Sequence, residues 1–177
     1  ISARHAQRIA DSLKVIAASL FAACSDYDAQ VMAEPLLALL AAAQGEERLA
    51  LICAVEQVPP EAIADAAMPE LLSALSRFLK CGQEPIVLAT LGAMRTMLGR
   101  APKLASVFLP LVEAAPQDTF GICYSRAVLL GRCGCPVTAP GADNQALFLN
   151  NLKTAVHWIV KLVTIDYLRD RAMEDPD

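Results

Sequence analysis

The sequence predicts an all-α protein, an α-solenoid-like stack of antiparallel helix pairs with a long C-terminal helix. Three observations support this fold class. The chain contains 32 alanines and 25 leucines among 177 residues, and both residue types favour helices. Apolar residues recur at steps of three and four, which is the helical spacing. Gly and Pro interrupt this pattern at intervals typical of helix ends. A chain of this length can bury one continuous core, so a single domain over 1–177 is expected.

The first expected helix spans residues 3–24 and is amphipathic. Six apolar residues fall on one of its faces: Ala6, Ile9, Leu13, Ile16, Leu20 and Ala23. Ser25 and Asp26 follow it and can cap the next element. We expect this helix to flank or cap the rest of the stack.

The expected helix pairs occupy about residues 28–132. Helices are predicted near 28–44, 46–58, 68–81, 84–98, 101–116 and 119–130, with a short helical turn at 62–67. Several begin with Pro in the first turn, where its missing N–H has no intrahelical partner to lose. Pro35 and Pro110 lie inside their segments and should kink or split them.

A longer period connects these pairs. Leucine-rich first helices recur from Leu36 to Leu71, after 35 residues, and from Leu71 to Leu109, after 38 residues. This arrangement resembles an armadillo or HEAT-type helical repeat over roughly 28–132. The resemblance implies a stack whose neighbouring pairs bury one another's apolar faces and present an extended surface to partners. An irregular helical bundle is the alternative.

The C-terminal part is expected to contain three segments. Residues 133–142 are rich in Gly and Pro and form a loop, residues 143–171 form a long helix, and residues 172–177 form an acidic, disordered tail. The long helix is apolar around most of its circumference, so it should be buried. Alternatively, Trp158 and Tyr167 form an exposed patch that a partner or a second copy covers.

Composition and charge exclude several classes of protein. A net charge of -4 argues against a general nucleic-acid binder. No apolar run reaches the roughly 20 residues that span a bilayer, so no membrane helix is expected. The six cysteines lie mostly within apolar helical patterns, which favours a reducing intracellular compartment, cytoplasmic or nuclear. We expect the chain to be a domain of a longer protein.

No complete catalytic or metal-binding motif is visible. Cys133 and Cys135 are separated by one residue, and the second cysteine pair of a zinc site is missing, so they are expected to be free thiols in a loop. His5 and His157 have no nucleophile or acid at a predictable distance. The sequence therefore predicts no cofactor, no metal and no enzymatic activity. A nucleophilic thiol at Cys133 or Cys135 is the enzymatic alternative.

Charge is distributed unevenly along the chain. Residues 26–70 contain nine acidic residues and one basic residue, whereas residues 77–132 contain seven basic and three acidic residues. In a solenoid the second helices of successive pairs share a surface, which would align Arg95, Arg126 and Arg132 in a stripe for an acidic peptide, an acidic helix or a phosphate backbone. The alternatives are a solvated face that serves solubility, or contact between the two charge blocks in self-association.

These observations predict a non-enzymatic protein–protein interaction module of a larger intracellular scaffold or regulatory protein. Its expected partner-binding residues are Arg95, Arg126, Arg132, Trp158 and Tyr167. The partner would be an acidic peptide or helix, and a homodimer is a further option. The alternative is a nucleic-acid-binding helical-repeat domain that uses the basic half, residues 77–132.

Overall fold

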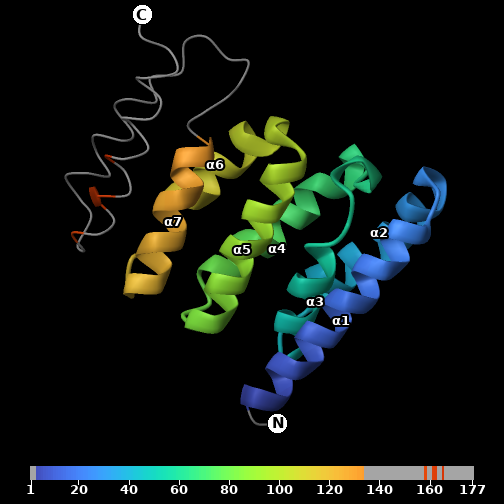
Figure 1. Ribbon diagram of the computed structural model, residues 1–177, viewed down its shortest axis with the longest axis horizontal. Coiled ribbons are helices and arrows are strands. Elements are labelled where there is room, and N and C mark those ends of the chain that lie inside the picture. Colours follow the sequence, from blue (N-terminus) through green and yellow to red (C-terminus); the bar gives the residue numbers. More distant parts are fainter. Residues whose placement is uncertain (1–2, 134–157, 159–160, 163–164, 166–177) are drawn as a thin grey trace, which may run out of the picture. The chain divides into compact units, whose positions relative to one another are not determined.

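The computed structural model describes residues 3–133 together with Trp158, Lys161, Leu162 and Ile165 (Figure 1). Regular structure in this part of the chain is entirely helical, which confirms the all-α prediction. The α-helices are α1 (Ala3–Ala23), α2 (Asp26–Ala42), α3 (Glu47–Val55), α4 (Met68–Leu79), α5 (Glu84–Arg100), α6 (Ala105–Glu113) and α7 (Phe120–Cys133). Three short 3-10 helices connect them: η1 (Pro60–Ala62), η2 (Asp65–Ala67) and η3 (Pro102–Leu104).

Local signals account for most helix starts. The Ser25 hydroxyl accepts a hydrogen bond from the backbone N–H of Asp28 at 3.3 Å and caps α2 as predicted. Helices α4 and α5 each carry Pro in the first turn, and both begin at the predicted residue. Pro35 and Pro110 lie inside α2 and α6, and each of these helices is continuous.

The chain divides into two compact units, residues 1–101 and 102–177, and each is described by itself. In the first unit, α3 packs against α1, α2 and α5, while α4 packs against α2 and α5. Large side chains that are fully buried there include Leu40, Ile52 and Leu75. Helix α3 is therefore the centre of this unit, which explains why a helix of only nine residues is apolar on several sides.

Helix α1 packs on α3 through alanines. Ala10 is 0% exposed and Ala17 is 8% exposed. The larger apolar residues named above are not buried: Ile9, Leu13, Ile16 and Leu20 are 42%, 36%, 54% and 50% exposed. The predicted amphipathic helix is present, but its apolar face is not the face that meets α3, because small side chains allow the closer approach.

In the second unit α6 packs against α7, around buried Phe108 and Leu129. The Thr119 hydroxyl accepts a hydrogen bond from the backbone N–H of Ile122 at 3.4 Å and so caps the start of α7. Helix α7 continues to Cys133, so the predicted loop 133–142 does not include its first residue.

The remaining C-terminal predictions fall mostly outside the described residues. These are the loop after Cys133, most of the long helix 143–171 with Tyr167, and the acidic tail 172–177. Across the part that is described, none of the helices combines the length and apolarity needed to traverse a bilayer.

Candidate interaction surface

The structure gives Arg126 a role inside the fold. Arg126 is only 9% exposed. Its Nε donates a hydrogen bond to the Val112 carbonyl at 3.0 Å, and its Nη2 donates one to the Glu113 carbonyl at 3.0 Å. Desolvation lowers the pKa of this guanidinium below its ordinary value. These carbonyls end α6, where no intrahelical donors remain. Arg126 thus fastens α7 to α6 and is not available to a partner, which corrects its assignment as a partner-binding residue.

The other predicted binding residues do not all belong to the same compact unit. Arg95 is exposed in the first unit, and Arg132 is exposed in the second. A continuous basic stripe stays a prediction, and Arg126 no longer belongs to it. Trp158 is helical and 73% exposed, which agrees with the exposed-patch alternative. Tyr167 lies outside the described residues.

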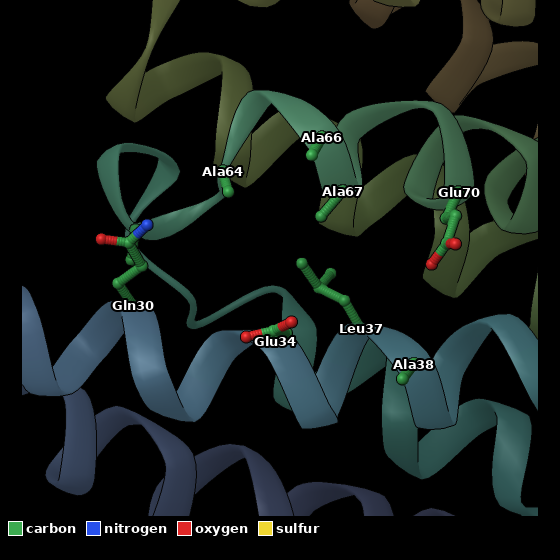
Figure 2. Close-up of a pocket in the computed structure, with 9 residues that line it drawn as sticks. Gln30, Glu34, Leu37, Ala38, Ala64, Ala66, Ala67 and Glu70 are labelled. Atoms are coloured by element: carbon green, nitrogen blue, oxygen red, sulfur yellow. The ribbon is translucent and has the colours of Figure 1, made fainter.

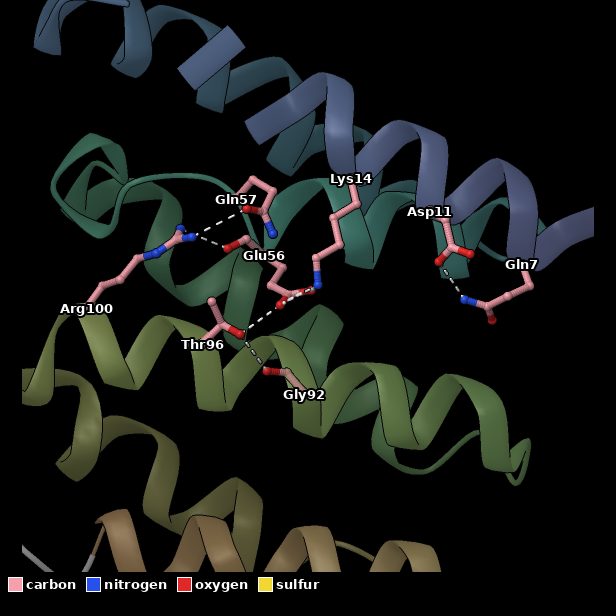
Figure 3. A network of polar contacts seen from close by, with 8 residues as sticks. All are labelled: Gln7, Asp11, Lys14, Glu56, Gln57, Gly92, Thr96 and Arg100. Atoms are coloured by element: carbon pink, nitrogen blue, oxygen red, sulfur yellow. Dashed lines mark hydrogen bonds and ion pairs between the residues drawn. The ribbon is translucent and has the colours of Figure 1, made fainter. Parts of the chain in front are cut away.

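A polar network joins three helices of the first unit (Figure 3). Lys14 Nζ of α1 lies 2.9 Å from both carboxylate oxygens of Glu56, which follows α3, and Thr96 of α5 donates its hydroxyl to Glu56 Oε1 at 2.7 Å. Arg100 also donates to the Glu56 backbone carbonyl at 3.1 Å. The Glu56 carboxylate is thus occupied by a cation and a hydroxyl, and it holds helices together rather than offering a free base.

A small acidic pocket lies between α2 and the segment from η1 to α4 (Figure 2). Its volume is about 270 Å³. Gln30 and Glu34 of α2 and Glu70 of α4 supply its polar groups, and alanines supply much of the remaining wall. The lining contains neither a histidine nor a thiol, so the carboxylates of Glu34 and Glu70 are the ionisable groups that it offers.

A larger groove is lined by residues of α1 and α3, and α2 contributes Leu39 to it. Its volume is about 720 Å³. Its lining residues are Ala6, Ile9, Leu13, Leu39, Glu46, Glu47, Ala50 and Leu51. Three of the apolar side chains are substantially exposed, with Leu39 at 58%. We call this feature the α1–α2 groove.

Two carboxylates line the α1–α2 groove, those of Glu46 and Glu47, and the fold uses that of Glu47. Glu47 Oε1 accepts hydrogen bonds from the backbone N–H groups of Gln44 at 3.0 Å and Gly45 at 2.9 Å. These bonds, that of Gly45 first, lower the pKa of Glu47 below its ordinary value. The groove is therefore mainly an apolar surface, and the charge of Glu47 is already partly compensated by backbone donors.

Several apolar side chains of α1 and α2 are exposed, and three of them, Ile9, Leu13 and Leu39, line this groove. The exposed apolar residues of these two helices are Ile9, Leu13, Val15, Ile16, Leu20, Tyr27, Val31 and Leu39. Single exposed apolar residues are normal on protein surfaces, but a contiguous group marks an interaction site. The spacing along α1 was visible in the sequence, whereas the exposure of this face was not.

The cysteines offer little reactivity. Cys133 is 3% exposed at the end of α7, and burial raises its thiol pKa to about 11. It is not the loop thiol that the sequence predicted, and Cys135 lies outside the described residues. Within residues 3–133 and the four described residues beyond them, no three His, Cys, Asp or Glu side chains gather as metal ligands would.

Comparisons of this chain with protein-family models, with curated proteins and with solved structures gave no match. Functional inference therefore depends on the geometry and chemistry of the described surfaces.

Proposed function

We propose that this chain is a protein–protein interaction module, built as a helical-repeat stack, that binds a helix of a protein partner in the α1–α2 groove. The observation that carries the proposal is the groove itself, whose exposed apolar side chains come from adjacent helices. Grooves of this kind accept the apolar face of an amphipathic helix, with anchors at positions i, i+3 or i+4, and i+7.

The helix contacts support the repeat stack. Helices α2 and α3 form one contacting pair, and α4 and α5 form the next. Between pairs, α2 packs on α4 and α3 packs on α5, so each row stacks on itself. Helix α1 extends the row of α3 and α5, and α6 and α7 form a further pair in the second unit.

This arrangement explains the position of the groove. Helix α1 belongs to the row of α3 and α5, but no helix of residues 3–133 lies beside α1 in line with α2 and α4. A helix at that place would contact α1, α2 and α3, the three helices that line the groove. Because neighbouring elements of a solenoid cover one another's apolar faces, a helix is the occupant that best fits this position.

Affinity capture with quantitative mass spectrometry tests the proposal. The comparison uses the wild-type chain, the groove variant Leu13→Asp/Leu39→Asp, and Val15→Asp as a matched control on the same helix. We expect the groove variant to lose a defined set of partners that the control retains. Equal recovery of all partners by the wild type and the groove variant would contradict the proposal.

The earlier predictions provide a further arm of this experiment. Reversing the charges of Arg95 and Arg132 tests the basic-stripe version, and unchanged capture would remove it. The nucleic-acid-binding alternative uses residues 77–132, and within this range Arg126 is already bound to backbone carbonyls of the fold. This alternative stays a prediction, and the absence of any complex with single or double strands at low salt would refute it.

A further inference from the structure

We infer that the α1–α2 groove takes helix α1 of a second copy of this chain, so that two copies form an antiparallel dimer. The inference rests on the proposed function, because it names the occupant of the same groove. It depends on three features of α1: a free coiled-coil seam, a self-complementary order of residues along that seam, and opposite charge at the two ends.

The apolar residues of α1 follow the spacing of a coiled-coil seam. They are Ala6, Ile9, Leu13, Ile16, Leu20 and Ala23, and their steps alternate between three and four residues. The packing of α1 on α3 uses Ala10 and Ala17 instead. Helix α1 therefore has one face that meets the fold and a second face that is suited to another helix.

The order of residues along this seam is self-complementary when two copies of α1 run antiparallel. If Leu13 of one copy lies opposite Ile16 of the second copy, Ile9 lies opposite Leu20. The alanines at the two ends, Ala6 and Ala23, then meet each other. Each layer joins a residue of the first half of the helix to one of the second half, so a two-fold axis relates the copies.

The charges at the two ends of α1 favour the same orientation. Arg4 and Arg8 lie in its first two turns, and Asp26 and Asp28 follow its last turn. An antiparallel pair places the basic end of each copy beside the acidic end of the other. A parallel pair would place like charges together, which is unfavourable. The charges at the ends of α1 therefore favour the antiparallel orientation, although Glu46 and Glu47 of the groove lie on the side that receives the acidic end of the second copy.

The geometry of the groove permits each copy to place its helix α1 in the groove of the other copy. The seam residues Ile9 and Leu13 form the α1 side of the groove, and Leu39 of α2 and residues of α3 line the same space. When α1 of the second copy fills this groove, two-fold symmetry places α1 of the first copy in the groove of the second. Both unpartnered faces are then covered by one interface.

Light scattering of the 177-residue chain after size exclusion tests the inference. A single chain has a mass of 18.9 kDa, and we expect the wild type to have twice this mass. Leu13→Asp and Ile16→Asp should return the single-chain mass with an unchanged helical circular dichroism signal, because both sites are already partly exposed. Val15→Asp is the matched control and should remain dimeric, because Val15 is 66% exposed and lies off the seam.

The orientation has its own test. Arg4→Glu alone and Asp26→Lys alone should each weaken the dimer by about 3- to 30-fold at low salt, and the two changes combined in one chain should restore its affinity. A parallel pair would not show this restoration. Failure of the combined variant to regain affinity would overturn the antiparallel arrangement.

Other outcomes separate this inference from the proposed function. A wild type that stays at the single-chain mass at all concentrations overturns the dimer. Groove-dependent capture of a different protein would in that case still support the proposed function. A dimer that survives both seam substitutions overturns the inference as well, because the copies must then meet elsewhere. Failure of the capture experiment together with a monomeric wild type would remove both.

Discussion

Replacing Arg126 by Met should destabilise the second unit by about 2 kcal/mol. The substitution removes the guanidinium that binds the last carbonyls of α6, and it keeps most of the aliphatic part of the side chain. The two donated bonds, at 3.0 Å each, reach the carbonyls of Val112 and Glu113. A hydrogen bond from a charged group contributes about 1.5–3 kcal/mol, so the upper limit for two such bonds is about 6 kcal/mol.

Two features of the structure reduce this limit. The Val112 carbonyl also accepts the backbone N–H of Ala115 at 3.3 Å, and Glu113 is exposed, so water can reach its carbonyl. Burial also destabilises the charged guanidinium, as its lowered pKa indicates, and Met avoids that cost. The net loss should therefore be about one third of the limit, and a melting temperature of a chain this size should fall by about 4–8 °C.

The measurement is thermal unfolding followed by circular dichroism, combined with hydrogen exchange to locate the change. Amides of α6 and α7 should lose protection, while those of α3 should keep it. Arg132→Met is the control, since Arg132 is exposed and its substitution should change stability by less than about 0.5 kcal/mol. If Arg126→Met and Arg132→Met unfold at the same temperature, the assignment of Arg126 to the fold is wrong.

Further predictions concern the backbone, the polar network and the thiols. Gly82 has a φ of +71°, so Gly82→Ala should lower the free energy of unfolding by about 1 kcal/mol in urea titrations. Gly92→Ala should raise the free energy of unfolding by up to about 1 kcal/mol, because an added Cβ in α5 meets nothing within 4 Å. If the two glycine substitutions change this free energy in the same direction, both predictions are contradicted. Glu56→Gln should lower stability by about 1 kcal/mol, because it removes a cation pair whose lysine is 44% exposed, and an unchanged urea midpoint would refute this. Alkylation at neutral pH should be slower at Cys133 than at the partly exposed Cys24, and a faster reaction at Cys133 would revive the nucleophile hypothesis. The unfolded Cys133 thiol ionises near its ordinary pKa of 9.0 and the folded one at about 11, so its contribution to stability is complete below pH 9 and is lost as pH rises to 11; this loss should disappear in Cys133→Ala.

Elements governed by local chemistry were predictable. The cap at Ser25 and the helix openings at Pro69 and Pro85 depend on a hydroxyl or a fixed φ within one turn, and the structure has all three. The extent to which individual apolar side chains are buried was less predictable from the sequence. Leu40 and Leu88 both lie within the apolar helical patterns of their segments, yet Leu40 is fully buried and Leu88 is only partly buried. The difference arises because helical spacing selects a face, while the number of neighbours on that face depends on packing.

The sequence by itself determined that this protein is helical, where most of its helices begin, and that α1 carries a continuous apolar face. Only the tertiary structure decided that α3 meets the alanines of this helix and leaves Ile9 and Leu13 exposed, and that Arg126 is enclosed by α6. The physical reason is the range of the interactions. Capping and helix propensity act within a few residues, whereas the face that is buried depends on segments distant in the chain and on how closely their side chains allow them to approach.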